Sequence, residues 1–294
     1  MKPFIVANPV AGNADTAELR RLFDEHLPEY EYEIFETTGE EKLSEVVAQA
    51  LGRGFDLIIA AGGDGTVSSV AAGLVNQPVP MAILPIGTGN ALARELGIPL
   101  DPEGAVQLLL NGHDVRQIDG MWVKGWFSVL SVGIGITSMT MRDTGREQKR
   151  RFGILAYLWT GLLQLGGVGL NRFELEIDGK IKVVKASEVF ISNSRVVGVK
   201  PFNLGEDVQP DDGVMAVCVV RARTAWDYLR VAAQLAVGQR RKKEIDCDQA
   251  QQVVKVSASR QLPVQADGEI VGNTPVEVQV VPAAVRVVVP KDSL

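Results

Sequence analysis

Two glycine-rich segments contain the residue types that bind anions. The first runs Gly-Gly-Asp-Gly-Thr from Gly62 to Thr66, and the second runs Pro-Ile-Gly-Thr-Gly-Asn from Pro85 to Asn90. Glycine lets a backbone adopt positive φ and approach a ligand closely, and successive N–H groups in such a loop bind anions. The pattern therefore predicts a site for phosphate groups, as in a nucleoside triphosphate.

A carboxylate in the first segment adds a metal ion to this prediction. Asp64 would repel phosphate unless a cation such as Mg²⁺ stood between them. The alternative is a plain β-turn at the end of a strand, but the second glycine segment, with Thr88 and Asn90, argues for a ligand. No Gly-Lys-Ser/Thr sequence follows either segment, so the site is not a Walker-type phosphate loop.

The elements around both segments alternate between strand and helix. Strands are predicted at Phe4–Ala7, Tyr30–Phe35, Asp56–Ala61 and Met81–Leu84. Asp56–Ala61 suits a central parallel strand that is buried on both faces. Two of these strands run directly into the glycine segments, and open α/β sheets bind ligands at the carboxyl ends of their strands. We predict an open, Rossmann-like α/β domain with a parallel sheet.

The rest of the chain has the pattern of an antiparallel β domain. Glu174–Lys185 predicts a hairpin, because Asp178-Gly179 at its centre is a typical two-residue turn. Further strands are predicted at Val189–Ser192, Val214–Arg221, Val253–Ser257, Val276–Val281 and Val285–Val289, with one strong helix at Thr224–Gln239. We predict a mainly antiparallel β-sandwich over residues 123–284. It follows an α/β domain over residues 1–122, to which residues 285–294 return.

Five ordered segments resemble a known superfamily. They are Asn8-Pro9 with Gly12, the two glycine segments, Gln209–Gly213 and Gln265–Glu269. Together they resemble the diacylglycerol kinase and sphingosine kinase superfamily, and the last two resemble its bacterial soluble lipid kinases. The resemblance implies an ATP-dependent kinase that phosphorylates a lipid hydroxyl in a cleft between the domains, with the β-rich domain holding the lipid. The acceptor would be diacylglycerol, a sphingoid base or a related lipid.

The resemblance also assigns nucleotide contacts. They are Asn8, Pro9, Val10, Ala11, Gly12, Thr37, Gly62, Gly63, Asp64, Gly65, Thr66, Val67, Ser68, Thr88 and Asn90. Thr38 is adjacent to Thr37 and is an alternative for its place. Asn90 is followed by Ala91 instead of the aspartate usual in diacylglycerol kinases, which is similar to the sphingosine and ceramide kinase branch.

Carboxylates in the second domain match further family positions. The resemblance assigns Asp267 as the catalytic base, which orients the lipid hydroxyl and accepts its proton. Glu269 would lie on the same face of an extended segment and support Asp267 or bind metal. Asp212 matches a structural Mg²⁺ ligand, completed by the backbone carbonyls of Gln209 and Val214. For both aspartates the alternative is a simple turn, because each precedes a glycine.

Basic runs suggest contact with a membrane surface. Arg146–Arg151, with Arg142, and Arg240–Lys243 are candidates for reversible attachment to an anionic leaflet, and solvated helix ends are the alternative. The uncharged stretch after the first run predicts a buried or interfacial helix at Phe152–Leu165, not a membrane span. We expect a lipid acceptor and a peripheral contact with the inner face of the membrane.

The remaining features place limits on the function. The net charge of −6 argues against binding to nucleic acid. The N-terminus lacks a signal-peptide core, and Cys218 and Cys247 have no metal-ligand or redox spacing, so we expect a reducing, cytoplasmic location without disulfides. A homodimer is compatible with the sequence, which does not specify the oligomeric state.

Two other functions fit the sequence less well than a lipid kinase does. An NAD kinase is disfavoured because no Asn-Glu-Asp-type segment occurs between residues 91 and 150. A nucleotide-binding regulator without catalysis is disfavoured because Asp64, Asp267 and Glu269 are all present, and a pure binder has no evident need for the last two.

Overall fold

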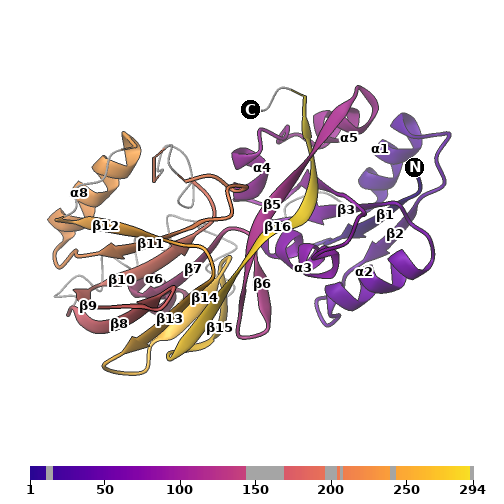
Figure 1. Ribbon diagram of the computed structural model, residues 1–294. Coiled ribbons are helices and arrows are strands. Elements are labelled where there is room, and N and C mark those ends of the chain that lie inside the picture. The colour runs from indigo at the N-terminus through magenta and orange to yellow at the C-terminus, as the bar shows by residue number, and fades with distance from the viewer. Residues whose placement is uncertain (11–15, 144–168, 196–203, 206–207, 239–242, 292–294) are drawn as a thin grey trace. The chain divides into compact units, whose positions relative to one another are not determined.

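The chain forms two compact units in a computed structural model (Figure 1). The structure describes residues 1–10, 16–143, 169–195, 204–205, 208–238 and 243–291. One unit comprises Met1–Ile118 with Ala283–Leu294, and the other comprises Asp119–Pro282. Two strands, β5 (His113–Val123) and β16 (Val276–Pro290), contribute residues to both units.

The first unit contains a parallel sheet with the order β2-β1-β3-β4. Its strands are β1 (Pro3–Ala7), β2 (Glu33–Glu36), β3 (Leu57–Gly62) and β4 (Met81–Pro85). Its helices are α1 (Thr16–His26), α2 (Leu43–Gly52), α3 (Asp64–Leu74), α4 (Ala91–Glu95) and α5 (Pro102–Leu110). Every residue of β1, β3 and β4 is buried, as expected for central strands covered on both faces. The predicted parallel α/β domain is confirmed.

The return of the chain to this sheet is visible in β16. Val287 of β16 pairs in parallel with Met81 of β4, and the N–H of Asn76 donates to the carbonyl of Ala284. The last described residues of the chain therefore extend the parallel sheet beyond β4.

The second unit contains a six-stranded antiparallel sheet with the order β12-β11-β10-β7-β14-β15. These strands are β7 (Ser131–Gly135), β10 (Glu188–Ser192), β11 (Met215–Val220), β12 (Ile245–Ala250), β14 (Pro263–Ala266) and β15 (Glu269–Asn273). The remaining elements are β6 (Trp126–Ser128), β8 (Asn171–Ile177), β9 (Lys180–Ala186), β13 (Val253–Ala258), α6 (Ile136–Asp143) and α8 (Ala225–Ala236). The antiparallel, β-rich character predicted for this part is confirmed.

The core of the second unit lies between two layers of strands. Val132 of β7 and Val217 of β11 belong to the same buried cluster as Phe173 of β8 and Val254 of β13. The alternation of buried and exposed residues along β8 shows why, since every second side chain of that strand points inward. The other face of the six-stranded sheet carries a smaller cluster, which includes Val231 of α8.

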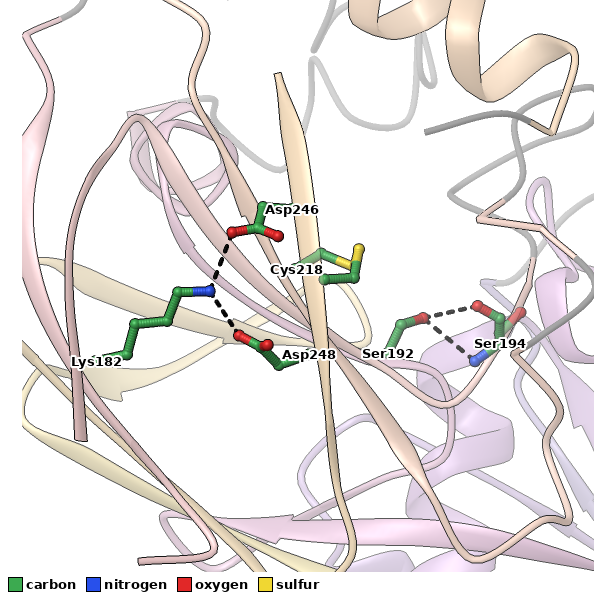
Figure 2. The surroundings of a disulfide bond; sticks show 7 residues. Lys182, Ser192, Ser194, Cys218, Asp246 and Asp248 are labelled. Atoms are coloured by element: carbon green, nitrogen blue, oxygen red, sulfur yellow. Dashed lines mark hydrogen bonds and ion pairs between the residues drawn. A yellow bond between two sulfur atoms is a disulfide. The ribbon is translucent and has the colours of Figure 1, made fainter. Parts of the chain in front are cut away.

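The expectation of two unpaired thiols is wrong. Cys218 of β11 and Cys247 of β12 face each other in register and form a disulfide, with their Cα atoms 4.0 Å apart. Figure 2 shows Lys182 reaching the carboxylates of Asp246 and Asp248, the residues before and after Cys247 in the sequence. Its Nζ lies 3.0 Å from Asp246 and 2.7 Å from Asp248. Sequence spacing did not reveal the pair, because 29 residues separate the cysteines and only the strand register brings them together. Because the two cysteines are bonded to each other, they do not indicate a reducing compartment.

Two membrane-related predictions fall outside the described residues. They are the helix at Phe152–Leu165 and the basic residues Arg146–Arg151 and Arg240–Lys242. Among the helices that the structure describes, none has the length and apolar character needed to cross a bilayer.

Candidate active site

The first glycine segment forms a tight passage from strand to helix. Gly62 ends β3, and α3 begins at Asp64. A Cβ atom on Gly62 would lie 2.5 Å from the Cβ of Thr66, so no larger residue fits where the first turn of α3 folds back over the strand. The start of a helix favours an anion in general, because its first N–H groups have no intrahelical acceptor.

The two glycine segments touch each other through their backbones. A Cβ atom on Gly87 would lie 2.4 Å from the Cα of Gly63, which is closer than any side chain can approach. The N–H of Ile86 also donates to the carbonyl of Gly62 at 3.2 Å. The glycines therefore allow two adjacent loops to pack as one surface at the carboxyl ends of β3 and β4.

Asp64 joins these loops through its carboxylate. Its Oδ1 accepts a hydrogen bond of 2.7 Å from the N–H of Ala91, the first residue of α4. A Cβ atom on Gly89 would lie 2.6 Å from Oδ2 of the same carboxylate. Asp64 thus has a structural partner at the start of α4, directly after the second glycine segment.

Asn90 shapes the second loop from within. Its backbone adopts the left-handed conformation, with φ of 51°. Its buried side chain accepts from the N–H of Gly87 and donates to the carbonyls of Gly87 and Pro85, at 3.1, 2.7 and 3.2 Å. These bonds use the amide group to hold the loop, whereas Thr88 is exposed at its tip.

The end of β1 lies against the same surface. Asn8 donates from Nδ2 to the hydroxyl of Thr66 at 3.1 Å, and its Oδ1 accepts from the N–H of Val10. Thr37 is buried, and its N–H donates to the carbonyl of Ala7 at 2.9 Å. The adjacent Thr38 is exposed and donates to Glu41 instead.

The predicted nucleotide residues therefore gather at one edge of the sheet in the first unit. Pro9 and Val10 are exposed there, Val67 and Ser68 are buried in α3, and Ala11 and Gly12 lie outside the described residues. The gathering is what parallel strands produce, because their carboxyl ends share an edge.

In the second unit, Asp267 lies at the turn of the hairpin between β14 and β15. Asp267 and Gly268 have φ angles of 46° and 88°, which is the pattern of a two-residue hairpin turn. The turn interpretation of Asp267-Gly268 is therefore correct as geometry. It does not account for the carboxylate, which lies against another segment.

Donors from residues 128–131 hold the carboxylate of Asp267. Oδ1 accepts from the hydroxyl of Ser128 at 2.7 Å and from the N–H groups of Leu130 and Ser131 at 3.2 and 2.8 Å, and Oδ2 accepts from the N–H of Val129 at 2.9 Å. A side chain held by so many donors has one orientation. Glu269, at the start of β15, is exposed.

A buried asparagine that the sequence did not single out braces this segment. Asn193 donates from Nδ2 to the carbonyls of Val129 and Asp119 at 3.1 and 2.8 Å, and its N–H donates to the carbonyl of Leu130 at 2.8 Å. Asn193 follows β10 directly, and no motif marked it because its partners are backbone atoms. The segment that holds Asp267 is therefore fixed from both sides.

The predicted metal-binding residues form a compact loop. Oδ1 of Asp212 accepts from the N–H of Val214 at 2.9 Å, and burial raises the pKa of the Asp212 carboxyl. The loop is anchored by Asp119, a buried residue that the sequence did not identify. Its N–H donates to the carbonyl of Pro210, and its Oδ2 accepts from the N–H of Gly213 at 2.6 Å. No cluster of three His, Cys, Asp or Glu side chains suited to a metal ion occurs within the described ranges.

A second buried carboxylate lies at the start of β10. Glu188 accepts from the N–H and the hydroxyl of Thr137, and burial raises its pKa to about 7. Gly133 and Gly135 of the neighbouring β7 leave the room it occupies, since a Cβ atom on Gly135 would lie 2.7 Å from Oε2. The sequence held no sign of this burial, because a glutamate at a strand start is ordinarily solvated.

Comparison with known proteins gives two family matches. Residues 2–123 match the diacylglycerol kinase catalytic domain, and residues 130–289 match the YegS C-terminal NAD kinase beta sandwich-like domain. A diacylglycerol kinase from Bacillus subtilis is 30% identical over 98% of this chain and 96% of its own length. An uncharacterized protein from Synechocystis is 31% identical over 98% of this chain and 70% of its own length.

The fold is also similar to that of a solved structure. The crystal structure of a diacylglycerol kinase from Bacillus anthracis superposes with a TM-score of 0.74 and 20% identity, covering 100% of this chain and 98% of that one. At this identity the likeness concerns the fold, and it agrees with the arrangement of an α/β unit followed by a β-rich unit.

Proposed function

The chain belongs to the diacylglycerol kinase family of lipid kinases, and from this premise we propose that it transfers the γ-phosphoryl group of ATP to the hydroxyl group of a lipid. The observation that carries the proposal is the paired glycine loops of the first unit. They present the start of α3, the exposed Thr88 and close backbone contacts at the carboxyl ends of β3 and β4.

Gly65 supports a phosphate site at these loops. It lies in the first turn of α3, and a Cβ atom there would meet nothing within 4 Å. A glycine within a helix destabilises it by up to about 1 kcal/mol relative to alanine. No neighbouring atom would clash with a side chain at Gly65, so packing does not explain the glycine. The approach of phosphate oxygens to the helix N-terminus gives the glycine a purpose.

Mg²⁺ is the cation that such a nucleotide carries. It would neutralise charge on the β- and γ-phosphates when bound, and Asp64 would contact it from the first loop. A second Mg²⁺ fits the loop of Gln209, Asp212 and Val214, because one carboxylate with carbonyl oxygens is a hard donor set. The Asp212 side chain is exposed, so a cation could reach its carboxylate.

Asp267 would activate the acceptor. Its carboxylate would accept the proton of the lipid hydroxyl while the hydroxyl oxygen forms the bond to the γ-phosphorus and the bond to ADP breaks. The donors at Ser128, Val129, Leu130 and Ser131 would keep the carboxylate in one orientation through this step. Glu269, two residues further on, would support it. The reaction requires Asp267 and the bound nucleotide to come together during turnover.

The acceptor would be diacylglycerol, a sphingoid base or a related lipid. Such a lipid resides in a bilayer, so the enzyme would work at the inner membrane surface as a peripheral protein. NAD is the competing acceptor, because the second family description relates the β-sandwich to NAD kinase.

One assay separates these acceptors. The protein would be incubated with γ-labelled ATP, Mg²⁺ and a total lipid extract, and in parallel with NAD, and the labelled products identified by mass spectrometry. We expect labelled phospholipid. Labelled NADP would show that the acceptor is NAD and not a lipid. ATP binding without any labelled product would contradict kinase activity.

A further inference from the structure

Helix α8 presents an apolar face to the solvent. Trp226 and Leu229 are 73% and 55% exposed, and Val237, which directly follows the helix, is 66% exposed. Ala233 is exposed between them. Their spacing places all four side chains on one side of the helix axis, because residues three, four and seven apart share a face. We call these four residues, together with the exposed Arg230, the α8 outer face.

The helix itself is well anchored by its opposite side. Val231 and Leu235 pack with Ile245 of β12 in the cluster that covers the disulfide-bonded Cys218. Thr224 and Asp227 close the start of the helix with a capping box. A surface helix normally turns its polar residues outward, and α8 has apolar residues on both sides. The α8 outer face (orange helix in Figure 1) therefore has the character of an interaction surface.

The charges around this face are net positive. Arg230 lies on the face, with its side chain 69% exposed, and Arg223 is exposed just before the helix. Asp227 is the one carboxylate in the sequence of α8. It caps the helix and lies 4.0 Å from Nη1 of Arg230, so two arginines face one carboxylate. The chain as a whole has a net charge of −6. A locally basic face on an acidic protein orients that face toward an anionic surface.

We propose that the α8 outer face docks on the anionic surface of a lipid bilayer. An exposed tryptophan beside leucine, valine and arginine is the composition of an interfacial helix, with the apolar side chains in the acyl boundary and the arginines among the headgroups. The inference rests on the proposed function, because a lipid acceptor must be reached at a membrane. It adds which surface of the protein makes the contact.

Vesicle co-sedimentation of the full chain tests the proposal without nucleotide. The vesicles contain phosphatidylcholine alone, or phosphatidylcholine and phosphatidylglycerol in equal parts. We expect the wild type to bind the mixed vesicles, and Trp226→Gln with Leu229→Gln to bind them at least ~10-fold more weakly. Arg223→Gln and Arg230→Gln should each weaken binding about fivefold, and high salt should mimic them. The matched control is Ile181→Thr with Val183→Thr, which removes apolar side chains 68% and 49% exposed on β9 and should leave binding unchanged.

Three results would contradict the proposal that the α8 outer face docks on a bilayer. They are no vesicle binding by the wild type, equal binding by the Trp226/Leu229 variant, and a wild-type dimer in sedimentation equilibrium that this variant dissociates. The last result would assign the face to a second copy of the chain.

Transfer of phosphate to a short-chain acceptor dispersed in water is measured separately. We expect the Trp226/Leu229 variant to retain this phosphate transfer. A wild type that lacks the transfer would contradict the proposed function, and the vesicle-binding result would stand independently.

Discussion

Asp64 in the first unit and Asp267 in the second are both held by backbone N–H groups, but in different ways. Asp64 accepts from the N–H of Ala91 in a neighbouring loop, and the glycines around it permit the loops to touch. Asp267 lies at a hairpin turn and accepts from three successive N–H groups and a hydroxyl of one segment. The first arrangement builds an open backbone surface, and the second fixes a single carboxylate.

This difference separates two tasks. A surface of loop N–H groups suits a ligand that brings its own negative charge, whereas an oriented carboxylate suits the acceptance of a proton. If the two units divide the reaction in this way, changes in one should alter nucleotide binding and changes in the other should alter turnover.

The largest effect is expected from Asp267→Asn. The amide keeps one acceptor oxygen for the donors at residues 128–131 but cannot accept the proton, so lipid phosphorylation should fall by at least ~100-fold. The check is the turnover number with saturating ATP, beside the thermal midpoint as a measure of folding. Glu269→Gln on the same hairpin is the control and should lose less than about 10-fold, because this exposed side chain only supports the base. A comparable loss of turnover in both variants would contradict the separate roles given to Asp267 and Glu269.

The disulfide should stabilise only the second unit. Closing a loop with a sequence separation of 29 residues restricts the unfolded chain, and we expect Cys218→Ser with Cys247→Ser to lower the free energy of unfolding by about 3–4 kcal/mol. Calorimetry with and without a reducing agent measures this change, and the double variant should be insensitive to the reductant. Two titratable thiols in the denatured, unreduced wild type would show that the bond is absent.

Gly87→Ala should disturb the first unit. The added Cβ meets the Cα of Gly63, and separating the loops should cost about 1–3 kcal/mol of stability as well as nucleotide affinity. Gly65→Ala is the matched variant, because its Cβ meets no atom and should leave stability equal or higher. Thermal unfolding of the two variants compares them directly. Equal midpoints would mean that the contact between the loops is not required.

The smallest effect is expected from the buried Glu188. Its pKa is raised to about 7 in the folded protein, so the folded state binds more protons than the unfolded state between the ordinary glutamate pKa and that value. Stability should therefore fall as pH rises through this window. Glu188→Gln should flatten the dependence by about 1–2 kcal/mol between about pH 5 and pH 6.5. Chemical denaturation at a series of pH values measures it, and an unchanged slope would mean that Glu188 is ionised throughout.

The sequence was informative where function depends on glycine and uninformative where it depends on backbone donors. Gly62 and Gly87 belong to recognisable motifs because close packing leaves no room for a Cβ atom at either position. Val129 and Leu130 donate through N–H groups that any residue except proline would provide, so their contribution to the Asp267 site leaves no pattern.

Features that depend on tertiary structure likewise left no pattern in the sequence. The two-unit fold followed from alternating strands and helices and from the ordered motifs, which also indicated the family. The disulfide of Cys218 and Cys247 depends on the register of β11 and β12, and the burial of Asp119 and Glu188 depends on tertiary packing. Neither register nor burial can be derived from local spacing alone.

The central claim is that nucleotide phosphates bind at the glycine loops while Asp267 serves the acceptor. Calorimetric titration of ATP with Mg²⁺ into the wild type, Gly65→Ala and Asp267→Asn tests it most directly. We expect Asp267→Asn to bind ATP within about threefold of the wild type and Gly65→Ala to bind at least ~10-fold more weakly while remaining folded. Unchanged ATP binding by Gly65→Ala, or equal weakening in both variants, would contradict the account.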